Sequence, residues 1–168
     1  MDHVKVKPET KQGDDSDLFS WHANVIKLRR RNSVVLINDK TQYALVLYGL
    51  RAKDFSRLDA LIPQAIQTVW RAEGIKESVI DDYLTRAGEV QFSKTKSRSL
   101  VAKLNQACKE VEFFEDDIDP EAQIQSTLSK KKSRLLVGRG KDYIYNQMKS
   151  YMKNCSISPV KSFSVYGL

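Results

Sequence analysis

Lysines and arginines gather in three short clusters along the chain. The basic residues are Arg29, Arg30 and Arg31 in the first cluster, Lys94, Lys96 and Arg98 in the second, and Lys130, Lys131, Lys132 and Arg134 in the third. Cations of this kind neutralise phosphates, which sets the affinity of a protein for DNA or RNA without reading a base sequence. The clusters therefore favour nucleic-acid binding, and three tyrosines near the C-terminus (Tyr143, Tyr145 and Tyr151) could stack on bases.

Each of these features also has an explanation that involves no ligand. Basic side chains on solvated faces keep a protein soluble, and tyrosines on an amphipathic helix are often half buried. The run from Lys130 to Lys132 would lie at the C-terminal end of a helix, where the helix dipole favours cations. The acidic run from Glu110 to Glu121 contains no base and could cover the basic tail. In that case the positive net charge would not indicate an exposed basic surface.

A second group of candidates is polar or aromatic. Its members are Trp21, His22, Asn24, Asn38, Thr41 and Thr95. Asn24 in a strand, and Asn38 with Thr41 in a turn, could form a polar site beside Lys94, Thr95 and Arg98. The alternative is structural, because Asn and Thr side chains stabilise a hairpin by bonding to its backbone. Trp21 and His22 could likewise pack at the edge of the domain.

Metal and cofactor chemistry find little support in the sequence. The two histidines and two cysteines do not form a ligand pair at zinc spacing, so we expect no metal site and no cofactor. The segment Gly138 to Lys141 looks like part of a nucleotide-binding loop. It lacks the first glycine of that motif and the Ser or Thr after the lysine. Such a basic turn could still hold an anion on its amides.

Catalytic residues are not assigned either. The sequence has no G-x-S-x-G nucleophile motif. Glu89 and Gln91, with Lys94 nearby, resemble part of the site of a metal-dependent nuclease, in which carboxylates on a strand bind magnesium near a lysine. A second acid for such a site is missing. An enzyme is therefore the third hypothesis, after nucleic-acid binding and a protein-interaction or regulatory module with an acidic protein partner.

The composition is that of a single globular domain. The 168 residues are 41% hydrophobic and 29% charged, with a net charge of +7. No apolar run approaches the length of a membrane span, and the N-terminus carries no signal peptide, so we expect a cytoplasmic protein without a membrane partner. The two cysteines are too few for a disulfide framework, and Cys108 falls on the apolar side of a predicted helix. The oligomeric state is left open.

Hydrophobic periodicity predicts the elements that carry these residues. Strands are expected over 21–28, 34–37 and 42–48 as an antiparallel meander, with a fourth strand over 89–92. Helices are expected over 55–70, 79–87 and 100–111, the last with Ser97 as its N-cap. The run Val34 to Ile37 is typical of a strand buried on both faces.

The ends of the chain give weaker patterns. Asp119-Pro120-Glu121 predicts a fresh helix start, and residues 142–153 look helical. The last dozen residues are rich in serine and are expected to be loose. Residues 1–17 are polar and without period, which predicts a disordered leader.

Three of these stretches together resemble a known family. They are Trp21-His22-Ala23-Asn24, Asn38-Asp39-Lys40-Thr41, and the stretch from Lys94-Thr95-Lys96-Ser97-Arg98-Ser99 to Asn105. Their order and spacing over about residues 18–115 resemble an uncharacterised bacterial family known only as a domain of unknown function. Its members occur alone or beside plasmid ORF-three-like domains. The resemblance implies an α+β domain and brings no catalytic residue.

The sequence thus predicts an α+β fold, with a small antiparallel meander, helices packed on one face and a basic helical extension. The expected divisions are a leader (1–17), a core domain (18–115) and the extension (116–168). The leading functional hypothesis is a nucleic-acid-binding accessory protein.

Overall fold

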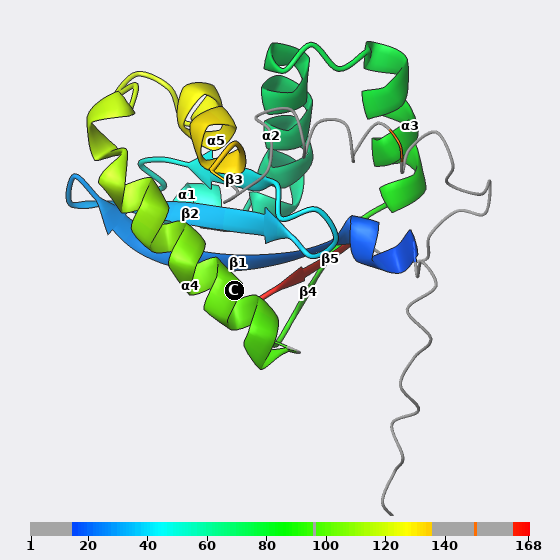
Figure 1. The fold of residues 1–168 in the computed structure, drawn as a ribbon, viewed down its shortest axis with the longest axis horizontal. Coiled ribbons are helices and arrows are strands. Elements are labelled where there is room, and N and C mark those ends of the chain that lie inside the picture. Colours follow the sequence, from blue (N-terminus) through cyan, green and yellow to red (C-terminus); the bar gives the residue numbers. More distant parts are fainter. Residues whose placement is uncertain (1–14, 96, 136–149, 151–162) are drawn as a thin grey trace, which may run out of the picture.

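A computed structural model describes residues 15–95, 97–135, 150 and 163–168 of the chain (Figure 1). These residues build one mixed sheet of five strands with the order β3-β2-β1-β5-β4. The strands are β1 (Ser20–Leu28), β2 (Arg31–Asn38), β3 (Ala44–Leu47), β4 (Val90–Ser93) and β5 (Phe163–Tyr166). The helices are α1 (Ala52–Phe55), α2 (Leu58–Ala72), α3 (Glu77–Ala87), α4 (Arg98–Phe113) and α5 (Ser126–Ser133), with 3-10 turns η1 (Asp15–Phe19) and η2 (Glu115–Asp117). The predicted α+β class is confirmed.

The predicted meander forms one half of the sheet. Strands β1, β2 and β3 are antiparallel neighbours, and the β1–β2 register runs from Trp21 opposite Asn38 to Leu28 opposite Arg31. Because Leu28 and Arg31 are paired, only Arg29 and Arg30 form the loop between them. The central run of β2, Val34 to Ile37, is buried on both faces as predicted.

The other half of the sheet comes from distant parts of the chain. Strand β5 lies between β1 and β4 and is parallel to both. The prediction that the last residues are loose is therefore wrong for 163–166, where Phe163 and Val165 are fully buried. A four-residue alternation of apolar and polar side chains becomes a strand here because β1 and β4 supply partners on both sides. Residues 116–168 thus contribute α5 and β5 to the fold, and no separate basic extension is seen among the residues described.

Helices cover both faces of the sheet, so the prediction of helices on one face is wrong. Figure 1 shows α2 and α3 on one side of the sheet and α4 on the other. Side chains of α2 and α3 form one core with Trp21, Val34 and Leu36. Side chains of α4 form a second core with Val35 and Ile37. A strand that is apolar on both faces needs cover on both sides, which explains why a single helical layer is not enough.

Helix α5 closes one edge of the sheet. The backbone N–H groups of Ala44 and Val46 in β3 donate to the hydroxyls of Ser133 and Ser129, both at 2.9 Å. The N–H of Gln125 donates to the carbonyl of Val46 at 2.9 Å. These bonds satisfy groups that an uncovered edge strand would present to another chain.

The predicted helix start at Asp119 is wrong, because α5 begins at Ser126. The Asp119 carboxylate instead accepts from the N–H of Glu121 at 3.0 Å, and the side chain of Gln125 bonds to both the N–H and the carbonyl of Asp119. The residues from 119 to 125 therefore form a turn that is held by side chains. By contrast, the predicted N-cap of α4 is confirmed, since Ser97 Oγ accepts from the N–H of Leu100 at 3.3 Å.

Several predictions fall outside the described residues. These are residues 1–14 of the leader predicted over 1–17, the glycine-rich turn at 138–141, the three C-terminal tyrosines and Cys155, together with the structure around Lys96 and almost all of the helix predicted over 142–153. Residues 15–17 are described and begin the 3-10 turn η1, so the prediction of disorder is wrong for them. Within the part of the chain that is described, no helix has the length and apolar character needed to cross a bilayer.

Candidate functional site

Most of the predicted polar site lies inside the protein. Asn38 is fully buried, and its side-chain NH₂ donates to the carbonyl of Leu18 at 2.8 Å. Its Oδ1 accepts from the N–H groups of Lys40 and Thr41, both at 3.0 Å. Thr41 is buried as well, and its Oγ1 accepts from the N–H of Tyr43. These two side chains stabilise the β2–β3 turn by bonding to its backbone. This is the structural role that the sequence offered as the alternative to a polar binding site.

Trp21 and His22 are also fully buried. Trp21 donates from Nε1 to the hydroxyl of Tyr83 at 3.1 Å. His22 Nδ1 lies 2.7 Å from Asp39 Oδ1, and its ring packs against Tyr166 at 5.0 Å between centroids. Nε2 of His22 has no hydrogen-bond partner among the described residues. Trp21 and His22 are thus enclosed in the fold, at the same end of the sheet as the turn that follows Asn38.

Asn24 lies further along β1, on the face covered by α4. Its Oδ1 accepts from the N–H of Val25 at 2.9 Å, and it also bonds to Cys108 on α4. Burial raises the pKa of the Cys108 thiol to about 11, so this cysteine is a neutral apolar group at physiological pH. Cys108 thus acts as the core residue that its position on the helix predicted.

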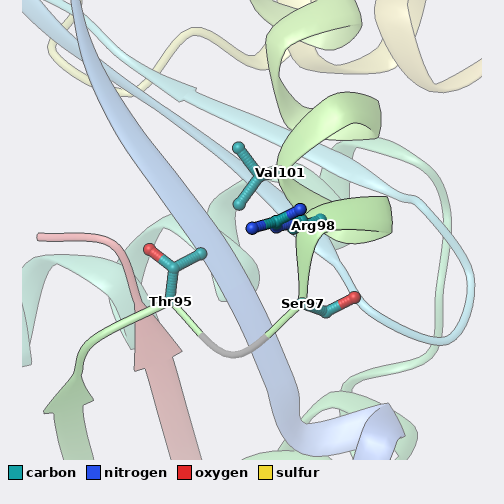
Figure 2. A pocket seen from close by; sticks show the side chains of 4 residues that line it. All are labelled: Thr95, Ser97, Arg98 and Val101. Carbon is teal, nitrogen blue, oxygen red and sulfur yellow. The ribbon is translucent and has the colours of Figure 1, made fainter.

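The second basic cluster surrounds the start of α4. Figure 2 shows Thr95, Arg98 and Val101 around a shallow pocket beside β1, while the Ser97 hydroxyl points away from it. This pocket has a volume of about 240 Å³. Lys94 and Arg98 are exposed, and Arg98 is the single cation among the lining residues that the structure describes. Asn38 and Thr41, being buried, do not join Thr95 here.

Three of the four cations in the third basic cluster pair with carboxylates within the fold. Lys132 Nζ lies 2.8 Å from the Glu110 carboxylate, and the Lys132 side chain is only 8% exposed. Lys131 pairs with Asp117 at 2.9 Å and Arg134 pairs with Glu73 at 2.7 Å. Lys130 donates to the carbonyl of Ala72 at 3.3 Å. Two of the three carboxylates belong to the acidic run, which therefore covers part of the basic tail.

The first basic cluster has an unusual backbone. Arg29 and Arg30 have φ angles of 46° and 65°, in the left-handed region. Positive φ at both loop positions is the requirement of a type I′ hairpin turn, which strongly prefers Asn-Gly or Gly-Gly. Arginine in this region carries a steric penalty of about 1 kcal/mol per residue. The hairpin therefore holds two cations at its tip at the expense of stability.

This hairpin also forms a basic pocket with a later segment of the chain. The lining residues are Lys27, Arg30, Arg31, Asn32, Gly49, Leu50 and Arg51, around a volume of about 230 Å³. The N–H of Leu50 donates to the carbonyl of Asn32 at 2.8 Å, which fixes the two segments side by side. Gly49 has a φ of 69°, and the stem of Arg31 lies over it. We call this the hairpin pocket.

The charge in the hairpin pocket is not balanced. None of its four cations, Lys27, Arg30, Arg31 and Arg51, forms an ion pair with a described carboxylate. Two acids bond to backbone N–H groups of this region: Glu115 accepts from the N–H of Arg29, and Asp54 accepts from the N–H of Arg51. Four neighbouring cations, none of them paired with a described carboxylate, give this part of the surface a local excess of positive charge.

The sequence pointed to part of this pocket only. Arg30 and Arg31 belong to the first predicted cluster, whereas Lys27 and Arg51 were not assigned to any cluster. Lys27 lies opposite Asn32 in the β1–β2 register. Pairing the two predicted strands across the turn would therefore have placed Lys27 beside it. Arg51 is brought in by the chain that follows β3, and no local pattern signals that.

The nuclease hypothesis gains no further residue. Glu89 is exposed just before the edge strand β4, and Lys94 is exposed after it. Across residues 15–95, 97–135, 150 and 163–168, no group of three or more His, Cys, Asp or Glu side chains could hold a metal ion together.

Comparison with known proteins identifies the family. The model of the family described as domain of unknown function DUF6933 matches residues 1–149, and the chain belongs to this family. No curated protein matches the chain, and no solved structure matches it. The family description assigns no activity.

Proposed function

We propose that this member of the DUF6933 family is a nucleic-acid-binding accessory protein of the bacterial cytoplasm, and that its hairpin pocket contacts phosphate groups. The observation that carries the proposal is the group of four unpaired cations around one pocket, Lys27, Arg30, Arg31 and Arg51. Phosphates of DNA or RNA would supply the missing counter-charge.

The energetics of the free protein support this proposal. Like charges in one pocket repel each other and lower the stability of the folded chain. The left-handed backbone at Arg29 and Arg30 adds a further penalty. Strained backbone of this kind is found most often at functional sites, so an observed outlier is a ground for a functional hypothesis. The free energy of binding a polyanion would offset both the repulsion between the pocket cations and the backbone penalty at Arg29 and Arg30.

The side-chain types in the pocket also suit phosphate. Three of the four cations are arginines, whose planar guanidinium matches phosphate oxygens with two parallel hydrogen bonds. Such contacts fix the position of a nucleic acid and carry no base preference. We therefore expect binding that depends on salt and depends little on sequence.

A salt titration tests this function. The protein is mixed with short single-stranded and duplex DNA and RNA, and the affinity is measured from low to moderate salt. The expected result is a linear fall of log K with log salt, with a slope near 0.7 to 0.9 for each phosphate that is neutralised. Absence of binding at low salt, or binding that salt does not change, would contradict the proposal.

A second candidate function is a protein-interaction module, and one observation favours it. Phe113 at the end of α4 is 82% exposed, within the acidic run between Glu110 and Glu121. An exposed aromatic ring among acids suits a basic protein partner better than a nucleic acid. A partner captured by the wild-type chain and lost in Phe113→Ser, with no nucleic acid recovered, would favour this candidate.

A further inference from the structure

The size of the hairpin pocket restricts what it can hold. Its volume of about 230 Å³ is below the roughly 300–1,000 Å³ of pockets that enclose drug-sized ligands. Its walls come from two segments, the hairpin residues 27–32 and the connection 49–51. This space suits a phosphate group with part of its sugar, and is small for a whole nucleotide.

The charge of the pocket exceeds what one internal phosphate can use. A phosphodiester in a nucleic-acid backbone carries one negative charge, whereas a phosphate monoester carries about −1.5 to −2 at pH 7 and has three acceptor oxygens. The pocket presents four cations, and Asn32 adds an amide group to its lining. This surplus of charge and donors matches a monoester better than a diester.

The backbone of the two pocket walls is fixed by hydrogen bonds. Lys27 and Asn32 face each other in the β1–β2 register, and the Leu50 N–H bond to Asn32 ties the second wall to the first. Leu28 and Leu50, next to these positions, are buried. A site on paired strands is already organised before the ligand arrives, so less free energy is lost on binding.

From these three observations we infer that the hairpin pocket binds a terminal phosphate monoester, held by Lys27, Arg30, Arg31 and Arg51. On a nucleic acid this group is a phosphorylated strand end, so the protein would prefer phosphorylated ends to an uninterrupted backbone. The inference rests on the proposed function for its macromolecular ligand. The same chemistry is present in a free nucleoside monophosphate, which the experiment includes separately.

The test compares four probes with the full-length protein. They are one oligonucleotide with a 5′-phosphate, with a 3′-phosphate or with hydroxyl ends, and a nucleoside monophosphate. The expected result is binding to one phosphorylated oligonucleotide that is at least about tenfold tighter than binding to the hydroxyl form, as expected for added hydrogen bonds to a charged group. Arg51→Gln should remove this preference, because it deletes one pocket cation and keeps most of the side-chain stem.

Lys53→Gln is the matched control. Lys53 is exposed on α1, two residues from Arg51, and does not line the pocket. The Lys53→Gln variant loses one positive charge, as Arg51→Gln does, and should keep the preference for the phosphorylated oligonucleotide. Circular dichroism of both variants checks that each is folded.

The outcomes separate the inference from the proposed function. Equal binding of phosphorylated and hydroxyl oligonucleotides overturns the inference and leaves nucleic-acid binding intact. Binding of the monophosphate alone, lost in Arg51→Gln, supports the pocket and contradicts the nucleic-acid function. Binding of no probe at low salt overturns both.

Discussion

The hairpin pocket and helix α5 carry the same kind of residue in opposite environments. At the C-terminal end of α5, Lys131, Lys132 and the capping residue Arg134 each pair with a carboxylate. In the hairpin pocket, Arg30, Arg31 and their two basic neighbours pair with no described carboxylate. The first group of cations is paired within the fold, whereas the second leaves a local excess of positive charge, which the proposed function assigns to phosphate binding.

The difference follows from where the acids lie. The carboxylate partners of these cations lie on α4 (Glu110), in η2 (Asp117) and directly after α2 (Glu73). At the hairpin, Glu115 and Asp54 bond to backbone N–H groups and form no ion pair with the pocket cations. Two clusters of four cations each can thus differ in their ion pairing, because tertiary contacts decide which charges remain unpaired.

The largest expected effect concerns the buried pair on α5. Replacing Lys132 by methionine leaves Glu110 without its partner inside the fold. We expect Lys132→Met to lower the free energy of unfolding by about 3 kcal/mol, the lower end of the range for a broken buried pair, because Glu110 is still 26% exposed. Urea unfolding measures the change. A drop below about 0.5 kcal/mol would show that this pair does not hold α5.

The next prediction separates stability from binding at the hairpin. Arg30→Gly relieves the left-handed backbone and removes one pocket cation. We expect the free energy of unfolding to rise by about 1 kcal/mol, and the affinity for nucleic acid to fall about tenfold. Urea unfolding and fluorescence anisotropy measure the two quantities. If binding is unchanged in Arg30→Gly, the strained arginine has no role in the proposed function.

A third prediction concerns the salt dependence of binding. Each phosphate contact that is lost should lower the slope of log K against log salt by about 1. We expect this reduction for Arg31→Gln, which removes a pocket cation, and no reduction for Lys130→Gln. Titrations of both variants at four salt concentrations measure the slopes. Equal slopes would place the phosphate contacts elsewhere.

The smallest expected effect is at the exposed pair on α5. The side chains of Lys131 and Asp117 are 47% and 35% exposed, and ion pairs in such positions contribute little. We expect Lys131→Met to change the free energy of unfolding by less than about 0.5 kcal/mol. A loss as large as that of Lys132→Met would mean that burial does not distinguish the two lysines.

The sequence predicted the local parts of the fold well. The meander, α2, α3 and α4 have strong periodic patterns, and Ser97 caps α4 as expected. Strand β5 was missed because its partners lie far away in the chain, and a four-residue alternation alone does not indicate a strand in the middle of a sheet. The turn type at Arg29 and Arg30 was also hidden, since neither residue is one that prefers positive φ.

The candidate site was predicted only in part. The first basic cluster does form the tip of a β-turn, as the sequence indicated, but Arg51 joins it through a tertiary contact. For the third cluster the sequence also offered a structural explanation, in which its cations lie at a helix end and are covered by the acidic run. The ion pairs of Lys131 and Lys132 with two carboxylates of that run agree with this explanation. His22 stood among the polar candidates, but its burial against Asp39 and Tyr166 depends on the strand pairing of β5.

The most direct measurement compares two double variants that lower the net charge equally. Arg30→Ala/Arg31→Ala removes two cations from the hairpin pocket, and Lys130→Ala/Lys131→Ala removes two from α5. Their affinities for one phosphorylated duplex are measured by anisotropy at the same low salt, with the wild-type chain alongside. We predict that the hairpin variant binds at least about tenfold more weakly than wild type, and that the α5 variant stays within about threefold. Equal losses in the two variants would show that total charge, and not the unpaired cations of the hairpin pocket, governs binding.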